Sequence, residues 1–224
     1  MNVYVLGDSI SIQYGPYLER GLRGIAGYAR KTGEAEARLN LDVPAGANGG
    51  DSAMVLAFLK AQFAAGGLNA DILLLNCGLH DIKTDPATGR KQVPIEAYEA
   101  NLRAIVKLVG SAGLCLVWIR TTPADEEVHN RRPDITFHRF AADVASYNAV
   151  ADRVMAEAGV PEIDLHAFTA SLGSDLYCDH VHFHESIREK QGTYIAGWIA
   201  GWLSGGRRTA CTPPSGKPPG TSAT

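Results

Sequence analysis

The chain has 224 residues, of which 46% are hydrophobic and 20% are charged, a composition typical of a globular protein with a sizeable core. It excludes a collagen, a coiled coil and a wholly disordered chain. The formal net charge of -3, from 21 basic and 24 acidic side chains without a long basic run, indicates no surface for nucleic acid or an anionic membrane.

Apolar runs predict the β-strands, which are in chain order Val3–Leu6, Leu39–Val43, Asp71–Asn76, Leu114–Ile119 and Glu162–Leu165. Most of these runs are continuous rather than alternating, as expected of parallel strands covered on both faces. None approaches the roughly 20 apolar residues of a membrane-spanning helix. The first run begins directly, without the features of a secretory signal. The sequence therefore predicts a cytoplasmic protein, or a secreted one if a leader has been removed.

Between the predicted strands, apolar residues recur at helical spacing. The stripes are Leu56, Leu59 and Phe63; Tyr98, Leu102, Ile105 and Val109; Phe140, Val144, Tyr147, Ala151 and Val154; and Ile187, Tyr194, Trp198 and Trp202. We expect them to face the core. Strands that alternate with helices predict an α/β fold with a doubly wound, mainly parallel sheet, in which ligands bind beyond the carboxyl ends of the strands.

The end of the chain differs in composition from the rest. Residues 205–224 are rich in Gly and Pro and contain no large aliphatic or aromatic side chain, so we expect them to be disordered. Residues 1–204 are then one globular domain. The cysteines Cys77, Cys115, Cys178 and Cys211 form no C-x-x-C pair, so neither a disulfide framework nor a zinc knuckle is predicted, and Cys115 is interpreted as a core residue.

A serine follows the first predicted strand, in Gly7-Asp8-Ser9. A hydroxyl on a tight turn at the carboxyl edge of a parallel sheet is well placed to be a nucleophile, because backbone N–H groups at the start of the next helix can stabilise an oxyanion. The alternative interpretation is a turn with a helix N-cap. The same tripeptide recurs as Gly50-Asp51-Ser52, where it opens a predicted helix.

Near the end of the predicted domain, Asp179 precedes His182 by three residues, just before the last predicted helix. In a turn, this spacing lets the carboxylate accept from one ring nitrogen while the other nitrogen faces a serine. Two alternatives remain open. The pair can be an ordinary surface loop, or the alternation of His180, His182 and His184 can indicate metal ligands.

A third polar segment, Gly78-Leu79-His80-Asp81, follows the third predicted strand. Taken in order, this segment, Gly7-Asp8-Ser9, the Gly50 segment and Asp179-x-x-His182 resemble the four blocks of SGNH (GDSL-type) hydrolases. The resemblance spans residues 1–204 and implies that they form one catalytic domain. It implies a flavodoxin-like three-layer α/β/α sandwich with about five mainly parallel strands, and ester hydrolysis through an acyl-enzyme.

The resemblance also implies a role for each site residue. Ser9 is the expected nucleophile, His182 its general base and then acid, and Asp179 the orienting carboxylate. The backbone N–H groups of Ser9 and Gly50 are expected to hold the oxyanion, together with a side chain from the third block. The family pattern in that block is Gly-x-Asn-Asp, whereas this chain has His80 in place of the asparagine.

Asp8 and Asp81 are interpreted as structural residues that fix their turns. No metal or other cofactor is expected. Besides hydrolysis, three functions stay open on the sequence: an O-acyltransferase with the same triad, a non-catalytic binding module favoured by His80, and a metal-dependent hydrolase.

The segment Arg120–Phe137 is longer than most connections and follows the fourth predicted strand at the same edge, which favours a functional loop. Its candidate substrate-binding residues are Thr122, His129, Asn130 and Arg131. The segment Ile82–Val93 is a second candidate rim. The polar character of these segments indicates a small-molecule or saccharide ester as substrate, with a short acyl group, acetyl first, on a carbohydrate or another polar carrier.

Overall fold

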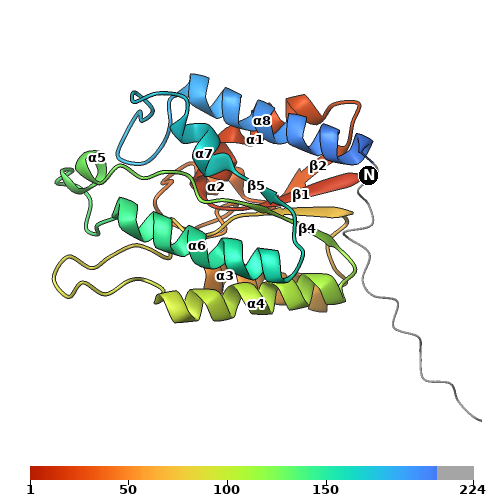
Figure 1. Ribbon diagram of the computed structural model, residues 1–224, viewed down its shortest axis with the longest axis horizontal. Coiled ribbons are helices and arrows are strands. Elements are labelled where there is room, and N and C mark those ends of the chain that lie inside the picture. The colour runs from red at the N-terminus through yellow and green to blue at the C-terminus, as the bar shows by residue number, and fades with distance from the viewer. Residues whose placement is uncertain (206–224) are drawn as a thin grey trace, which may run out of the picture.

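The computed structural model describes residues 1–205 and places a five-stranded parallel sheet between two layers of helices (Figure 1). The strands are β1 (Asn2–Leu6), β2 (Gly27–Arg30), β3 (Ile72–Leu75), β4 (Cys115–Ile119) and β5 (Glu162–Ile163). Their order in the sheet is β2-β1-β3-β4-β5, and every neighbouring pair is parallel. The predicted α/β class with about five parallel strands is confirmed.

Helices connect the strands and cover both faces of the sheet. They are α1 (Ser9–Leu22), α2 (Glu34–Ala37), α3 (Ser52–Ala64), α4 (Ile95–Ser111), α5 (Glu126–Asn130), α6 (Ala141–Glu157), α7 (Leu165–Ala170) and α8 (Glu185–Ser204). Helices α1, α7 and α8 lie on one face, and α3, α4 and α6 lie on the other (Figure 1). Because all the strands are parallel, their carboxyl ends lie at one edge of the sheet.

The central strands are buried because helices cover them on both sides. Every residue of β3 and β4 is buried, which agrees with their continuous apolar sequences. The predicted stripe of α4 is confirmed, since Tyr98, Leu102, Ile105 and Val109 are its buried residues.

The buried face of α8 differs from the predicted stripe. The helix buries Ile187, Ile195 and Ile199 toward the core. Trp198 and Trp202 are partly buried and stack on each other, with ring centroids 6.0 Å apart. The difference has a packing reason: a Cβ on the small residue Gly192 would lie 2.7 Å from a backbone atom of α1, so these two helices approach too closely for aromatic rings to fit between them.

The prediction of a strand at Leu39–Val43 is wrong, because the second strand is Gly27–Arg30. Leu39 is 86% exposed and Val43 is 48% exposed, so this run packs against no sheet. The Asn40 side chain instead accepts a hydrogen bond from the Asp42 backbone at 3.0 Å, which forms a turn.

The expected domain boundary falls at the end of α8, and the expected disorder of the tail lies outside the described residues from 206 onward. Within residues 1–205, no helix combines the length and the apolar character that crossing a membrane requires.

Candidate active site

Ser9 is the first residue of α1, directly beyond the carboxyl end of β1. The side chain of Asp8 caps the helix by accepting a hydrogen bond from Ile10 N at 3.0 Å. In the second copy of the tripeptide, Asp51 caps α3 in the same way and accepts from Met54 N at 3.0 Å. The capping interpretation therefore holds for both copies. Ser9 differs from Ser52 in what its hydroxyl contacts.

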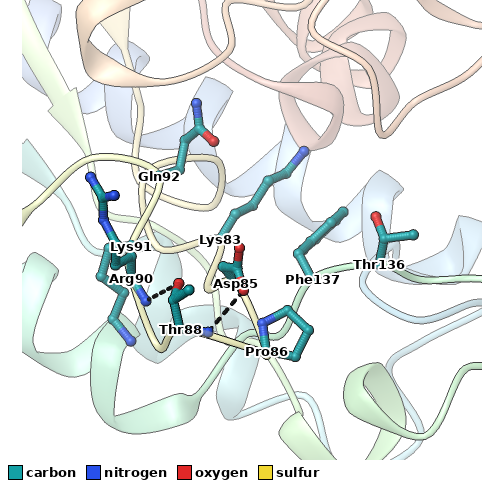
Figure 2. A pocket seen from close by; sticks show the side chains of 9 residues that line it. All are labelled: Lys83, Asp85, Pro86, Thr88, Arg90, Lys91, Gln92, Thr136 and Phe137. Atoms are coloured by element: carbon teal, nitrogen blue, oxygen red, sulfur yellow. Dashed lines mark hydrogen bonds between the residues drawn. The ribbon is translucent and has the colours of Figure 1, made fainter.

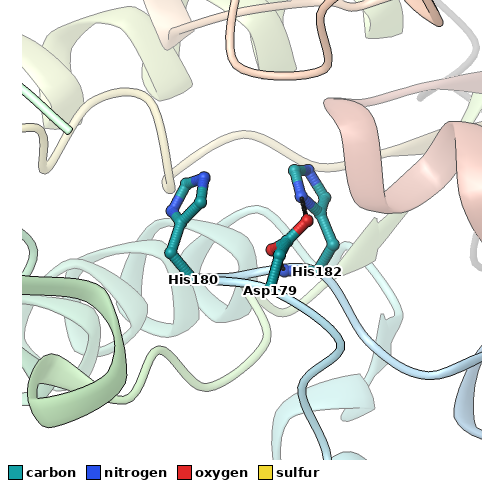
Figure 3. A group of neighbouring side chains, drawn as sticks. All are labelled: Asp179, His180 and His182. Atoms are coloured by element: carbon teal, nitrogen blue, oxygen red, sulfur yellow. Dashed lines mark hydrogen bonds and ion pairs between the residues drawn. The ribbon is translucent and has the colours of Figure 1, made fainter. Parts of the chain in front are cut away.

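The Ser9 hydroxyl lies in a chain of hydrogen bonds with His182 and Asp179. Ser9 Oγ is 2.9 Å from His182 Nε2. On the other side of the ring, His182 Nδ1 is 2.7 Å from Asp179 Oδ2, as Figure 3 shows. Because a carboxylate accepts, His182 carries its proton on Nδ1 and offers the Nε2 lone pair to the serine O–H. This is the geometry that a nucleophile, a base and an orienting carboxylate require.

The carboxylate of Asp179 is fixed by its own loop. Its second oxygen accepts the backbone N–H groups of Val181 at 2.9 Å and His182 at 2.7 Å. Burial raises the pKa of this carboxyl, but the hydrogen bonds from the His182 ring and from the two N–H groups outweigh it and hold the pKa well below its ordinary value. Asp179 is therefore an anion throughout the neutral range.

A second Asp–His pair lies beside the first and was not predicted. His180 Nε2 is 3.0 Å from the Asp42 carboxylate, and His180 Nδ1 is 2.8 Å from His129 Nδ1. The His180 and His182 rings meet edge to face, with centroids 5.8 Å apart. Burial, assisted by the positive charge of Arg139, lowers the pKa of His129 to about 4, so His129 is neutral at pH 7. The Asp42–His180 pair therefore packs beside the group formed by Ser9, His182 and Asp179.

The structure brings together two of the three alternating histidines. Ligand atoms of Asp179, His180 and His182 lie within 4.8 Å of one another and could hold a metal ion. Figure 3 shows that Asp179 is directed toward His182, while His180 stands apart. His184 is instead the N-cap residue of α8, and its ring nitrogen Nε2 lies 3.4 Å from the Asp175 carboxylate. His182 is hydrogen-bonded to Ser9, and His180 is hydrogen-bonded to Asp42. These contacts favour catalysis by a serine nucleophile over metal binding.

The candidate oxyanion groups come from three segments. Ser9 N–H belongs to the first turn of α1, where backbone donors have no acceptor within the helix. Gly50 has φ of 72°, and a Cβ there would lie 2.6 Å from Met54 Sδ, so the position requires glycine. The Gly50 N–H donates to Asn48 Oδ1 at 2.9 Å, and it must exchange this partner before it can bind an oxyanion.

His80 lies in the same region and is 4% exposed. Burial lowers its pKa well below the ordinary value, and the positive charges of Lys83 and Arg139 add to the effect. At pH 7 the ring is therefore a neutral imidazole, which donates from one nitrogen, as an asparagine amide would.

The turn that carries His80 is held on several sides. Both oxygens of the Asp81 carboxylate accept from Ser52 N, at 2.9 and 3.1 Å. Arg139, which the sequence analysis did not single out, is buried and donates from Nε to the Leu79 carbonyl at 2.8 Å. The positions of the oxyanion candidates thus depend on contacts between residues far apart in the chain.

The residues predicted to bind substrate make contacts within the protein. Thr122 and His129 are buried, and Asn130 bonds the backbone of Arg139 through both ends of its amide. Arg131 is exposed and pairs with Glu127 on α5. The predicted loop therefore contains a short helix whose side chains brace the site, and these four residues remain candidates for the substrate rim.

Cys77 and Cys178, each beside a site segment, are free cysteines. Cys77 is buried, whereas Cys178 is exposed and its sulfur contacts the carbonyl oxygen of Phe183 at 3.3 Å.

Replacing His80 with alanine is expected to lower kcat by about 10²-fold, the loss typical of one oxyanion donor. His80→Asn is expected to keep most of the activity and the same pH profile, because the imidazole is already uncharged at pH 7 and the amide is also a neutral donor. Initial rates with p-nitrophenyl acetate from about pH 5 to pH 9 check both variants. Full activity of His80→Ala would remove His80 from the site.

Comparison with known proteins bears on both the family and the fold. The model of the GDSL-like lipase/acylhydrolase family matches residues 5–187, while no curated protein sequence matches the chain. The fold is similar to that of a lipase/acylhydrolase from Enterococcus faecalis, with a TM-score of 0.65 and 18% identity over 90% of this chain and 96% of that one.

Two structures of acetylxylan esterases are similar to a comparable degree. AlAXEase has a TM-score of 0.66 and 13% identity over 89% of this chain and 100% of that one. Axe2 from Geobacillus stearothermophilus has a TM-score of 0.61 and 17% identity over 88% of this chain and 93% of that one. At such identities the likeness establishes the fold, and the family match covers most of the chain. The chain therefore belongs to the GDSL-like lipase/acylhydrolase family and is a carboxylic ester hydrolase.

Proposed function

We propose that this esterase removes short acyl groups, acetyl first, from a carbohydrate or a similar polar carrier through an acyl-enzyme on Ser9. The observation that carries the proposal is the hydrogen-bonded chain from Ser9 Oγ to His182 and on to Asp179. The similarity in fold to two acetylxylan esterases supports the choice of substrate class.

In the first half of the reaction, His182 Nε2 takes the proton of the Ser9 hydroxyl as Oγ attacks the ester carbonyl carbon. The new C–O bond leaves an oxyanion, and Asp179 stabilises the imidazolium that forms. When the tetrahedral intermediate collapses, the bond to the sugar oxygen breaks and His182 returns its proton to that oxygen. The products of this half are the free sugar hydroxyl and an acyl-Ser9.

In the second half, His182 takes a proton from water, which attacks the acyl carbon. Collapse breaks the bond to Ser9 Oγ, the proton returns to Ser9, and the carboxylic acid leaves. In both halves, we assign the Ser9 N–H and the neutral ring of His80 as donors to the oxyanion. The Gly50 N–H joins them when it leaves Asn48.

The proposed function predicts release of acetate from acetylated xylo-oligosaccharides, with p-nitrophenyl esters losing kcat/KM steadily from acetate to butyrate to octanoate. The polar and charged character of the two candidate rim segments, Arg120–Phe137 and Ile82–Val93, is the physical reason, because it gives a longer chain little apolar surface to bury. Enzymatic assay of acetate and spectrophotometric rates measure the two series.

A higher kcat/KM for octanoate than for acetate would contradict the proposed acyl preference. Faster transfer of acetyl to an added sugar than to water would identify an acyltransferase instead.

A further inference from the structure

A pocket of about 680 Å³ opens beside the segment that follows His80 (Figure 2). It lies between the hairpin-like segment at residues 83–92 and Phe137, because Thr84 forms backbone bridges with both Lys91 and His138. Figure 2 shows Arg90 and Lys91 together on one side of the pocket, with Lys83 and Phe137 on the other. Its volume falls in the usual range of small-molecule sites.

Lys83 is a half-buried cation without a carboxylate partner among the described residues. Its ammonium donates to the Asp42 backbone carbonyl at 2.9 Å and lies 4.4 Å from the centroid of the Phe137 ring. Burial lowers the pKa of Lys83 to about 8, so most of the population stays charged at pH 7. An ammonium in this position attracts an anion strongly, because little water screens it.

Other charges around the pocket add to the positive potential. Arg139 lies 4.9 Å from the same Phe137 ring, and its Nη1 is buried without a hydrogen-bond partner within residues 1–205. Arg90 is exposed and, in the described part of the chain, forms no ion pair. Lys91 is neutralised by Asp143 at 2.5 Å.

The one acidic side chain among the lining residues is turned toward its own loop. The Asp85 carboxylate accepts the backbone N–H groups of Ala87 at 2.8 Å and Thr88 at 3.0 Å. The pocket thus presents an excess of cations in a chain whose net charge is -3.

The pocket adjoins the candidate catalytic centre. The Lys83 backbone N–H donates to the His80 carbonyl at 3.3 Å, so the pocket begins one turn after the oxyanion candidate. The Asp42 residue that Lys83 touches also holds His180, whose ring lies against His182. The pocket is therefore a candidate site for a second group of the substrate whose ester lies at Ser9.

We propose that this pocket binds an anionic group on the sugar that carries the acyl ester, with Lys83 and Arg90 as its cationic contacts. The natural substrate is then an acidic saccharide ester rather than a neutral one. This inference rests on the proposed function, since it names the leaving-group half of the same reaction. A carboxylate of a uronic acid and a phosphate of a sugar phosphate share the required chemistry.

The test compares three mono-O-acetylated methyl glycosides that differ at one carbon: a glucoside, its uronate and its 6-phosphate. We expect kcat/KM for at least one of the anionic esters to exceed that for the neutral ester by about tenfold, which corresponds to about 1.4 kcal/mol. The advantage is expected to shrink as NaCl is raised, because salt screens the attraction. The anionic ester whose kcat/KM exceeds that of the neutral ester by the larger factor shows whether the pocket prefers a carboxylate or a phosphate.

Lys83→Met removes the charge and keeps most of the length of the side chain over Phe137. Arg90→Gln removes the charge at an exposed position, so we expect the variant to fold normally. Each variant is expected to lower the ratio of anionic to neutral kcat/KM, and the two together to bring it to about 1. Lys60→Met, at an exposed position on α3 outside the pocket, is the matched control and is expected to keep the ratio.

Calorimetric binding of the uronate and phosphate glycosides to Ser9→Ala protein separates this inference from the proposed function. Binding that depends on Lys83, without hydrolysis by the unmodified protein, would support the pocket and contradict the proposed function. Hydrolysis with equal kcat/KM for neutral and anionic esters would overturn the inference and leave the proposed function standing. A preference that survives both charge-removing substitutions would also overturn it.

Discussion

Ser9→Ala is expected to lower kcat for p-nitrophenyl acetate by about 10⁴- to 10⁶-fold, because no other group can form the acyl-enzyme and His182 then has no proton to take. The Ser9 hydroxyl is 2.9 Å from His182 Nε2 and is 5% exposed. Removing one oxygen leaves the Asp8 cap of α1 intact, so the fold is expected to persist. Stopped-flow and steady-state rates measure the loss, and thermal unfolding checks the structure.

The second copy of the tripeptide provides a matched control. Ser52 also begins a helix after a capping aspartate, but its hydroxyl accepts from Asn101 Nδ2 at 2.9 Å. Ser52→Ala keeps the backbone N–H that Asp81 holds, and it is expected to retain nearly all activity. Retained activity in Ser9→Ala, or its loss in Ser52→Ala with Ser9 unchanged, would contradict the assignment of the nucleophile.

The central sheet was predictable because burial leaves a direct trace in the sequence there. Strands β3 and β4 are covered by helices on both sides, so their residues are uniformly apolar. The edge strand β2 leaves no such trace, since its residues alternate between exposed and half-buried. The more apolar run at Leu39–Val43 was the better match to a strand pattern, and only the turn at Asn40 excludes it.

The candidate site could be predicted to the extent that its residues lie in short local motifs. Ser9 and the Asp179–His182 pair each follow from a local spacing beside a predicted element, and the fold brings them to hydrogen-bond distance. Asp42 and His180 have no such spacing, because 138 positions separate them. Arg139 reaches the Leu79 carbonyl across 60 positions, so only the folded chain reveals that contact.

Asp179→Asn is expected to lower kcat by about 10³- to 10⁴-fold, with a smaller change in KM. In the unmodified protein, the carboxylate accepts from His182 Nδ1 at 2.7 Å, which leaves Nε2 free to accept from Ser9. The other carboxylate oxygen accepts the Val181 and His182 N–H groups, so an amide at this position keeps its oxygen toward the backbone and turns its NH₂ toward the ring. His182 then carries its proton on Nε2 and cannot act as the base.

A control variant and an NMR measurement separate this effect from a loss of structure. Asp175→Asn, an exposed position in the same segment whose carboxylate faces His184 at 3.4 Å, is the matched control and is expected to leave kcat nearly unchanged. Proton NMR is expected to show the downfield Nδ1–H resonance of His182 in the unmodified protein and not in Asp179→Asn. If Asp179→Asn retained more than about a tenth of kcat, Asp179 would not be the orienting group, and Asp42 through His180 would be the carboxylate to test next.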